Sequence, residues 1–205
     1  MNQLPKKVVL SSKPNNYLSQ GLTNCGLFSI KGILSSYGLD DKGNPREYHS
    51  NLICRLTSVA WGTNYYNNIL ASYGLDSKIG FAEDASTEEK LNLLKKLLSK
   101  NTPVMIRIGN GYLSSGEYNR VIGKLMPHWV TLWGYDDESS FFYMYDSGLP
   151  EKEWNKSLLI GNTSRTYAEI LRDWNFGKIQ PWAWTVTGPH NFAYIAIKGV
   201  KNGKS

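Results

Sequence analysis

The pattern of apolar and polar positions predicts a helix over residues 25–37. Apolar residues recur there at intervals of three or four, which places them on one face of a helix. They are Leu27, Ile30, Leu34 and Tyr37. Asn24 is a good N-cap residue and Gly38 suits the position just past a helix end, so both boundaries are marked. Cys25 is therefore expected in the first turn.

Later segments alternate between helical and strand-like patterns. Helical spacing recurs at about 51–58, 64–73, 86–99 and 164–174, and the third of these opens with a Ser86–Glu89 capping box. Strands are predicted at 8–10, 103–108, 128–135, 141–146, 182–187 and 192–198, with a long loop at 109–127. Because helices come first and the strands after them are mostly antiparallel, the predicted fold class is α+β, with N-terminal helices packed on the sheet.

Composition and charge narrow the function classes. A chain of 205 residues with 41% hydrophobic content can bury a core, and we expect one domain over 1–205. The net charge is +6, but Lys and Arg are scattered, so no nucleic-acid partner is expected. We find no signal-peptide pattern and no apolar run near the ~18 residues of a membrane span. A secreted and a cytoplasmic location both stay open, and the sequence does not indicate an oligomeric state.

Cys25 is a candidate nucleophile. The first turn of a helix favours a thiolate, because unpaired backbone N–H groups and the helix dipole stabilise negative charge. Cys54 lies among apolar residues of the next predicted helix and is interpreted as a buried structural thiol. A disulfide between the two would silence Cys25, and the sequence leaves that pairing open. No cluster has metal-ligand spacing, and no cofactor is expected.

A nucleophilic cysteine needs a base, and the chain has three histidines. His49 stands in a polar loop and is interpreted as a surface residue, and His190 as a structural one. His128 begins a predicted strand whose hairpin partner ends in Asp146, so the two side chains can meet at one end of the sheet. A carboxylate in that place would orient the imidazole. Asp136 is the fallback partner for His128.

Several motifs in order resemble a known family. They are Gln20-x4-Cys25-Gly26, His128-Trp129-Val130 at the head of a strand, and Tyr145-Asp146 at the end of the next. In this spacing the chain resembles the papain-like cysteine peptidase superfamily, and within it the bacterial double-glycine leader peptidase branch. The resemblance covers about residues 17–148 and does not explain the C-terminal part. Leu27 and Ser147 stand where many members have proline, and neither is a reacting group.

The resemblance implies a papain-like fold and a thiol hydrolase that cleaves a peptide or amide bond in a peptide or protein substrate. Cys25 would form the acyl-enzyme, and His128 would be the base that Asp146 orients. The Gln20 side chain and the backbone N–H of Cys25 would stabilise the oxyanion. Two other readings stay open: amide exchange by an acyltransferase or transglutaminase-like enzyme with the same triad, and a peptide-binding module on an inactive peptidase scaffold.

Overall fold

The computed structural model describes residues 3–21, 23–49, 52–57, 62–112, 117–175 and 191–201. Within these ranges the helices are α1 (Cys25–Ser36), α2 (Leu52–Thr57), α3 (Gly62–Ser72), α4 (Thr87–Leu98), α5 (Arg120–Leu125) and α6 (Tyr167–Trp174). The strands are β1 (Lys7–Val9), β2 (Leu75–Phe81), β3 (Val104–Gly109), β4 (Pro127–Asp136), β5 (Phe141–Tyr145), β6 (Thr163–Thr166) and β7 (Ala193–Val200). Short 3-10 turns lie at Pro45–Tyr48 and Glu151–Glu153.

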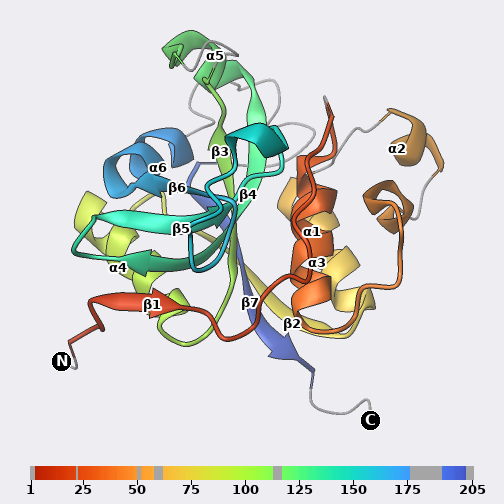
Figure 1. The fold of residues 1–205 in the computed structure, drawn as a ribbon, viewed down its shortest axis with the longest axis horizontal. Helices are drawn as coiled ribbons and strands as arrows, with labels where there is room; N and C mark the ends of the chain where they lie inside the picture. The colour runs from red at the N-terminus through yellow and green to blue at the C-terminus, as the bar shows by residue number, and fades with distance from the viewer. Residues whose placement is uncertain are drawn as a thin grey trace.

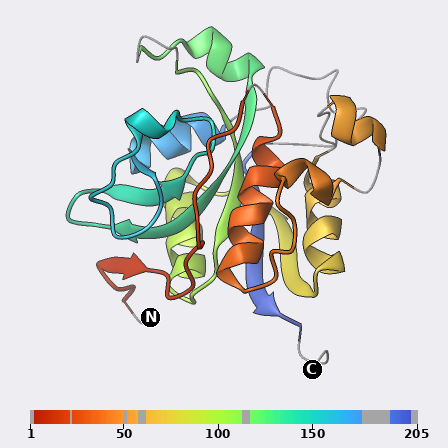
Figure 2. The same cartoon turned by 45° about the vertical axis from the view of Figure 1, so that its right-hand side comes forward.

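The strands form one antiparallel sheet in the order β2-β7-β3-β4-β5-β6, and β1 pairs with the far end of β4. Helices α1, α2 and α3 lie on one side of the long central strands, and α4 and α6 lie on the other (Figure 1). The start of α1 and the start of β4 lie at the same end of the molecule (Figure 2). The predicted α+β class with helices on a mostly antiparallel sheet is therefore confirmed.

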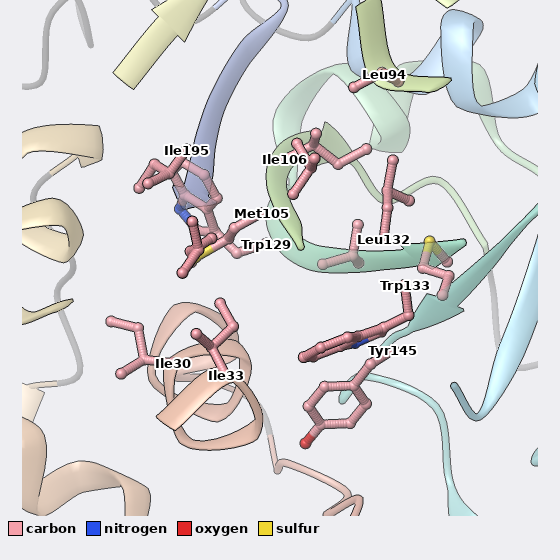
Figure 3. Packing of buried hydrophobic residues seen from close by; sticks show 14 of the residues in the cluster. Ile30, Ile33, Leu94, Met105, Ile106, Trp129, Leu132, Trp133, Tyr145 and Ile195 are labelled. Carbon is pink, nitrogen blue, oxygen red and sulfur yellow. The ribbon is translucent and has the colours of Figure 1, made fainter. Parts of the chain in front are cut away.

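The two faces of β3 and β4 carry separate parts of the core, because successive side chains of a strand point to opposite sides. On one face Ile30 and Ile33 of α1 lie against Met105 and Trp129 (Figure 3). On the opposite face, Ile106 and Leu132 point toward Leu94 of α4 (Figure 3). Burying an aliphatic side chain of this size contributes roughly 1.5–3 kcal/mol. The packing therefore fixes α1, and with it Cys25, against β4.

Sequence patterns located the main elements within a few residues. The helix at Cys25, the Ser86 capping box and the β4–β5 hairpin are all present. The glycine that ends α1 adopts the left-handed conformation expected of it, with φ 69° at Gly38. The predicted strand at 182–187 lies outside the described residues, and the one-domain organisation stays a prediction.

Three elements differ from the sequence prediction. Residues 109–127 are not one long loop, since they hold α5 and a bridge between Tyr112 and Tyr118. The sequence does not predict strand β2, because its apolar and polar residues do not alternate clearly. Its partner strand, β7, is more than 110 positions away. The helix predicted at 164–174 begins only at Tyr167, because Thr163–Thr166 adds strand β6 to β5. Among the described residues no helix has the length and apolar character that crossing a membrane requires.

Candidate active site

Cys25 is the first residue of α1, as the sequence predicts. Asn24 holds the N-cap position, but its side chain does not cap the helix, so that part of the prediction is wrong. Its backbone is left-handed instead, with φ 79°, a conformation that Asn tolerates better than most residues. The sharp turn presents the thiol beside β4, where the backbone N–H of Trp129 donates a hydrogen bond to Cys25 Sγ over 3.3 Å.

The glycine after Cys25 is required by a close approach of Tyr66. A Cβ built on Gly26 would lie only 2.2 Å from Cζ and 2.5 Å from the hydroxyl oxygen of the Tyr66 ring. Tyr66 is fully buried, and its ring packs edge-on against Trp129 with centroids 5.3 Å apart. Any larger residue at position 26 would therefore push α3 away from α1 and displace the thiol.

The β4–β5 hairpin brings His128 and Asp146 together. His128 is the second residue of β4, and Asp146 directly follows β5. His128 Nε2 and Asp146 Oδ1 lie 2.6 Å apart, and both side chains are buried. The fallback partner, Asp136, lies at the other end of β4 and forms an ion pair with Lys7 over 2.8 Å. Of the two carboxylates considered from the sequence, only Asp146 reaches His128.

Asp146 is held through its backbone and through both carboxylate oxygens. The side chain of Asn162 accepts a hydrogen bond from the backbone N–H of Asp146 and donates one to the Asp146 carbonyl, each over 2.8 Å. Oδ1 also accepts the N–H of Gly148 over 2.9 Å, and Oδ2 accepts Arg165 Nη2 over 2.9 Å. Sequence patterns gave no sign of Arg165 or Asn162, since both lie beyond the matched motifs and make their contacts only in the folded chain.

Cys25, His128 and Asp146 shift one another's pKa values so that Cys25 and His128 both favour their charged forms. Burial disfavours the thiolate of Cys25, but the hydrogen bond and charge of His128, with backbone N–H groups, outweigh it and lower the thiol pKa from its ordinary value. Burial also disfavours the imidazolium, yet Asp146 and Cys25 raise the pKa of His128 to about 10. The pKa of Asp146 stays well below its usual range despite burial, because His128 and Arg165 are positively charged neighbours. This environment favours thiolate and imidazolium together.

Gln20 lines the same cleft as Cys25 and is positioned by Ser147. The backbone N–H of Gln20 donates to the Ser147 carbonyl over 2.7 Å, and the Ser147 hydroxyl donates to Gln20 Oε1 over 2.5 Å. This leaves the Nε2 group of Gln20 as the donor available to the cleft. Ser147, one of the two departures from the motif that the sequence showed, therefore supplies the contact that fixes Gln20.

A cleft of about 460 Å³ joins these residues. Its wall includes Gln20, Cys25 and His128, and also Arg107 of β3, a buried cation. The hydroxyl of Tyr66 is buried at this wall with no hydrogen-bond partner among the described residues. The remaining lining residues are Gly21, Thr23, Asn24, Gly62, Asn110, Tyr112, Ile122, Met126, Pro127, Trp129 and Gly148.

The structure also tests how His49 and Cys54 were interpreted from the sequence. His49 is fully buried, so its interpretation as a surface residue is wrong. It lies 2.5 Å from the Tyr65 hydroxyl and 3.4 Å from Asn24 Oδ1, and so supports the turn before Cys25. Cys54 is buried, as predicted, and both cysteines are free thiols, so no disulfide silences Cys25. His190 lies outside the described residues. Within the described part of the chain, no group of His, Cys, Asp and Glu could hold a metal ion.

Comparison with known proteins identifies the family. The model of the Peptidase_C39-like family matches residues 8–172. The chain belongs to this family. The match supports the papain-like cysteine peptidase superfamily indicated by the motifs, and it extends from β1 almost to the end of α6. A search of curated proteins gives no match to the chain. A peptidase of this kind acts on a peptide or protein substrate.

Proposed function

We propose that the chain is a cysteine peptidase that cleaves a peptide or amide bond through an acyl-enzyme on Cys25. The observation that carries this proposal is that Cys25 and His128 line one cleft while buried Asp146 bonds His128, with pKa directions that favour a thiolate beside an imidazolium. A thiolate is the reactive form of cysteine, and the pair supplies it without a separate deprotonation step.

In the proposed reaction the Cys25 thiolate attacks the scissile carbonyl carbon. The carbonyl oxygen gains negative charge, which the Nε2 group of Gln20 and the backbone N–H of Cys25 are placed to stabilise. His128 then gives its proton to the leaving amine, and the C–N bond breaks to leave a thioester. Water, deprotonated by His128, attacks the thioester and releases the acid product with the Cys25 thiolate.

Asp146 does not exchange a proton in this scheme. Its contact with Nε2 of His128 turns the other ring nitrogen, Nδ1, toward Cys25 and stabilises the imidazolium. Hydrolysis and amide exchange differ only in whether water or an amine resolves the thioester. Product analysis by mass spectrometry with and without an added primary amine separates the two.

The experiment that tests the proposal compares Cys25→Ala with Cys54→Ala. Both variants lose one buried or partly buried thiol, so the second is a matched control. We expect cleavage of a mixed peptide library, followed by mass spectrometry, to disappear in Cys25→Ala and to persist in Cys54→Ala. Cleavage that survives in Cys25→Ala would exclude Cys25 as the nucleophile. A wild-type protein that cleaves nothing, and whose Cys25 reacts with iodoacetamide no faster than an ordinary thiol, would favour the binding-module reading.

A further inference from the structure

Asp146 has a second carboxylate oxygen that the proposed mechanism does not use. Oδ1 serves His128 and Gly148, whereas Oδ2 accepts a hydrogen bond from Arg165 over 2.9 Å. Arg165 lies on β6, opposite Phe142 of β5, and its side chain is only 7% exposed. A buried cation therefore lies directly behind the carboxylate that faces His128.

Arg165 is itself held by a second buried carboxylate. Its Nη1 group lies 3.2 Å from Oδ2 of Asp173, a residue of α6 with a fully buried side chain. Asp173 also accepts the Tyr118 hydroxyl over 2.5 Å and two nitrogens of Arg172. The planar guanidinium thus joins two carboxylates at a fixed angle, which the single ammonium of a lysine cannot reproduce.

This arrangement answers two physical needs of Asp146. A carboxylate removed from water is costly to keep ionised unless a cation lies close to it. Its plane must also stay fixed if it is to aim one oxygen at His128. Hydrogen bonds to both oxygens leave the carboxylate one orientation, and the guanidinium supplies the charge.

We propose that Arg165 and Asp173 are a positioning pair that fixes the orientation and the ionised state of Asp146. The proposal rests on the proposed function, because it assigns these residues a role in the same site. It also gives a role to the C-terminal part of the chain, which the motifs up to about residue 148 leave unexplained. Asp173 lies one residue beyond the family match.

The pair also connects the triad to the wall of the cleft. The Arg165 guanidinium lies over the ring of Tyr112, 4.8 Å from its centre, and Tyr112 lines the cleft. The Tyr112 hydroxyl donates to Glu169 of α6 over 2.8 Å. Helix α6 therefore holds the cleft wall and the carboxylate of the triad through adjacent side chains.

The test uses Arg165→Met, Arg165→Lys and Asp173→Asn, with Arg172→Met as the matched control. Arg172 also donates two hydrogen bonds to Asp173. Its side chain is 39% exposed, whereas that of Arg165 is 7% exposed and bonds Asp146 directly. Each variant is measured for kcat and KM, and for the pH dependence of Cys25 alkylation by iodoacetamide. The ionisable groups around Asp146 are His128, Cys25, Tyr145, Arg165 and Asp173, and only the last two are changed.

We expect Arg165→Met to lower kcat by about tenfold to a hundredfold with little change in KM, the range that one charged hydrogen bond typically supplies. Without the cation, Asp146 takes up a proton at higher pH. The acid limb, meaning the pH range in which the Cys25 alkylation rate falls as the pH is lowered, should therefore move toward neutral pH by about one pH unit or more. Arg165→Lys should lie between this variant and wild type. Asp173→Asn should leave the acid limb in place, because it removes a negative charge and keeps the cation.

Several results would overturn the proposal. They include an unchanged kcat and acid limb in Arg165→Met, and an equal effect of Arg172→Met. An acid limb that moves in the same direction in Asp173→Asn as in Arg165→Met would show general loosening of the fold. If Arg165→Met does not fold, the test is the contrast between an acid limb that moves in Arg165→Lys and one that stays in place in Asp173→Asn. Failure of the proposed function looks different, because the wild-type protein would then show no rapid alkylation of Cys25 and no turnover.

Discussion

Replacing Asp146 by Asn should remove most of the preference of His128 for its charged form. The structure places the pKa of His128 at about 10, against an ordinary value of 6.5. At about 1.4 kcal/mol for each pH unit, the surroundings favour the imidazolium by on the order of 5 kcal/mol. Burial alone works in the opposite direction, and the charge of Asp146 is the largest effect that opposes it. The substitution keeps the shape of the side chain and removes that charge.

The direction of the pH effect follows from these contributions. A raised histidine pKa means that the imidazolium is present at lower pH and is lost as the pH rises through about 10. In Asp146→Asn the buried ring should lose its proton near or below its ordinary pKa, so at neutral pH the imidazolium is largely lost and less of Cys25 is thiolate.

The assay is a titration of the His128 ring by NMR, assigned by its absence in a His128→Ala sample. Asp136→Asn is the matched control, since Asp136 is also a buried carboxylate of this sheet but pairs with Lys7. We expect the His128 titration to fall by several pH units in Asp146→Asn and to stay in place in Asp136→Asn. The same alkaline titration in wild type and Asp146→Asn would refute the reasoning.

Three further predictions concern residues around the cleft. Gln20→Ala should lower kcat by about 10²–10³-fold with little change in KM. Ser147→Ala should lower kcat less, because the Gln20 side chain remains. In steady-state kinetics, a Gln20→Ala variant whose KM rises as much as its kcat falls would argue against an oxyanion role. Gly26→Ala should lower the free energy of unfolding by about 1–3 kcal/mol in a thermal melt, because the new Cβ overlaps the Tyr66 ring. The control Gly43→Ala should leave the stability unchanged, because a Cβ there has nothing within 4 Å. Arg107→Gln should lower the rate of Cys25 alkylation by iodoacetate relative to iodoacetamide by about threefold or more, since it removes a buried cation from the cleft wall; an unchanged ratio, as expected for the exposed control Arg120→Gln, would contradict this.

The sequence was most informative where the signal was local. The helix at Cys25 and the β4–β5 hairpin follow from periodicity and turn residues within about 20 positions, so their geometry could be predicted. The hairpin also predicts that Asp146 lies next to His128, as the structure shows. These two elements carry three of the four candidate residues, and the packing of the helix against the hairpin brings the three together in the folded chain.

The missing parts depend on contacts between distant segments. His49 stands in a polar stretch, and only the packing of Tyr65 and Asn24 buries it. Arg165 looks like one more charge in a basic chain until β6 pairs with β5 and directs it to Asp146. Neither burial nor an ion pair can be derived from composition, because both depend on which strands become neighbours.

The reactivity of Cys25 at different pH values tests the central claim most directly. Wild-type protein is treated with iodoacetamide across a pH series, and the alkylation rates of Cys25 and Cys54 are read separately by peptide mass mapping. Because the pKa of the Cys25 thiol is lowered, its alkylation rate should rise at a lower pH than that of an ordinary thiol, while buried Cys54 reacts slowly. A Cys25 rate that rises only through the pH range of an ordinary thiol would contradict the thiolate–imidazolium pair.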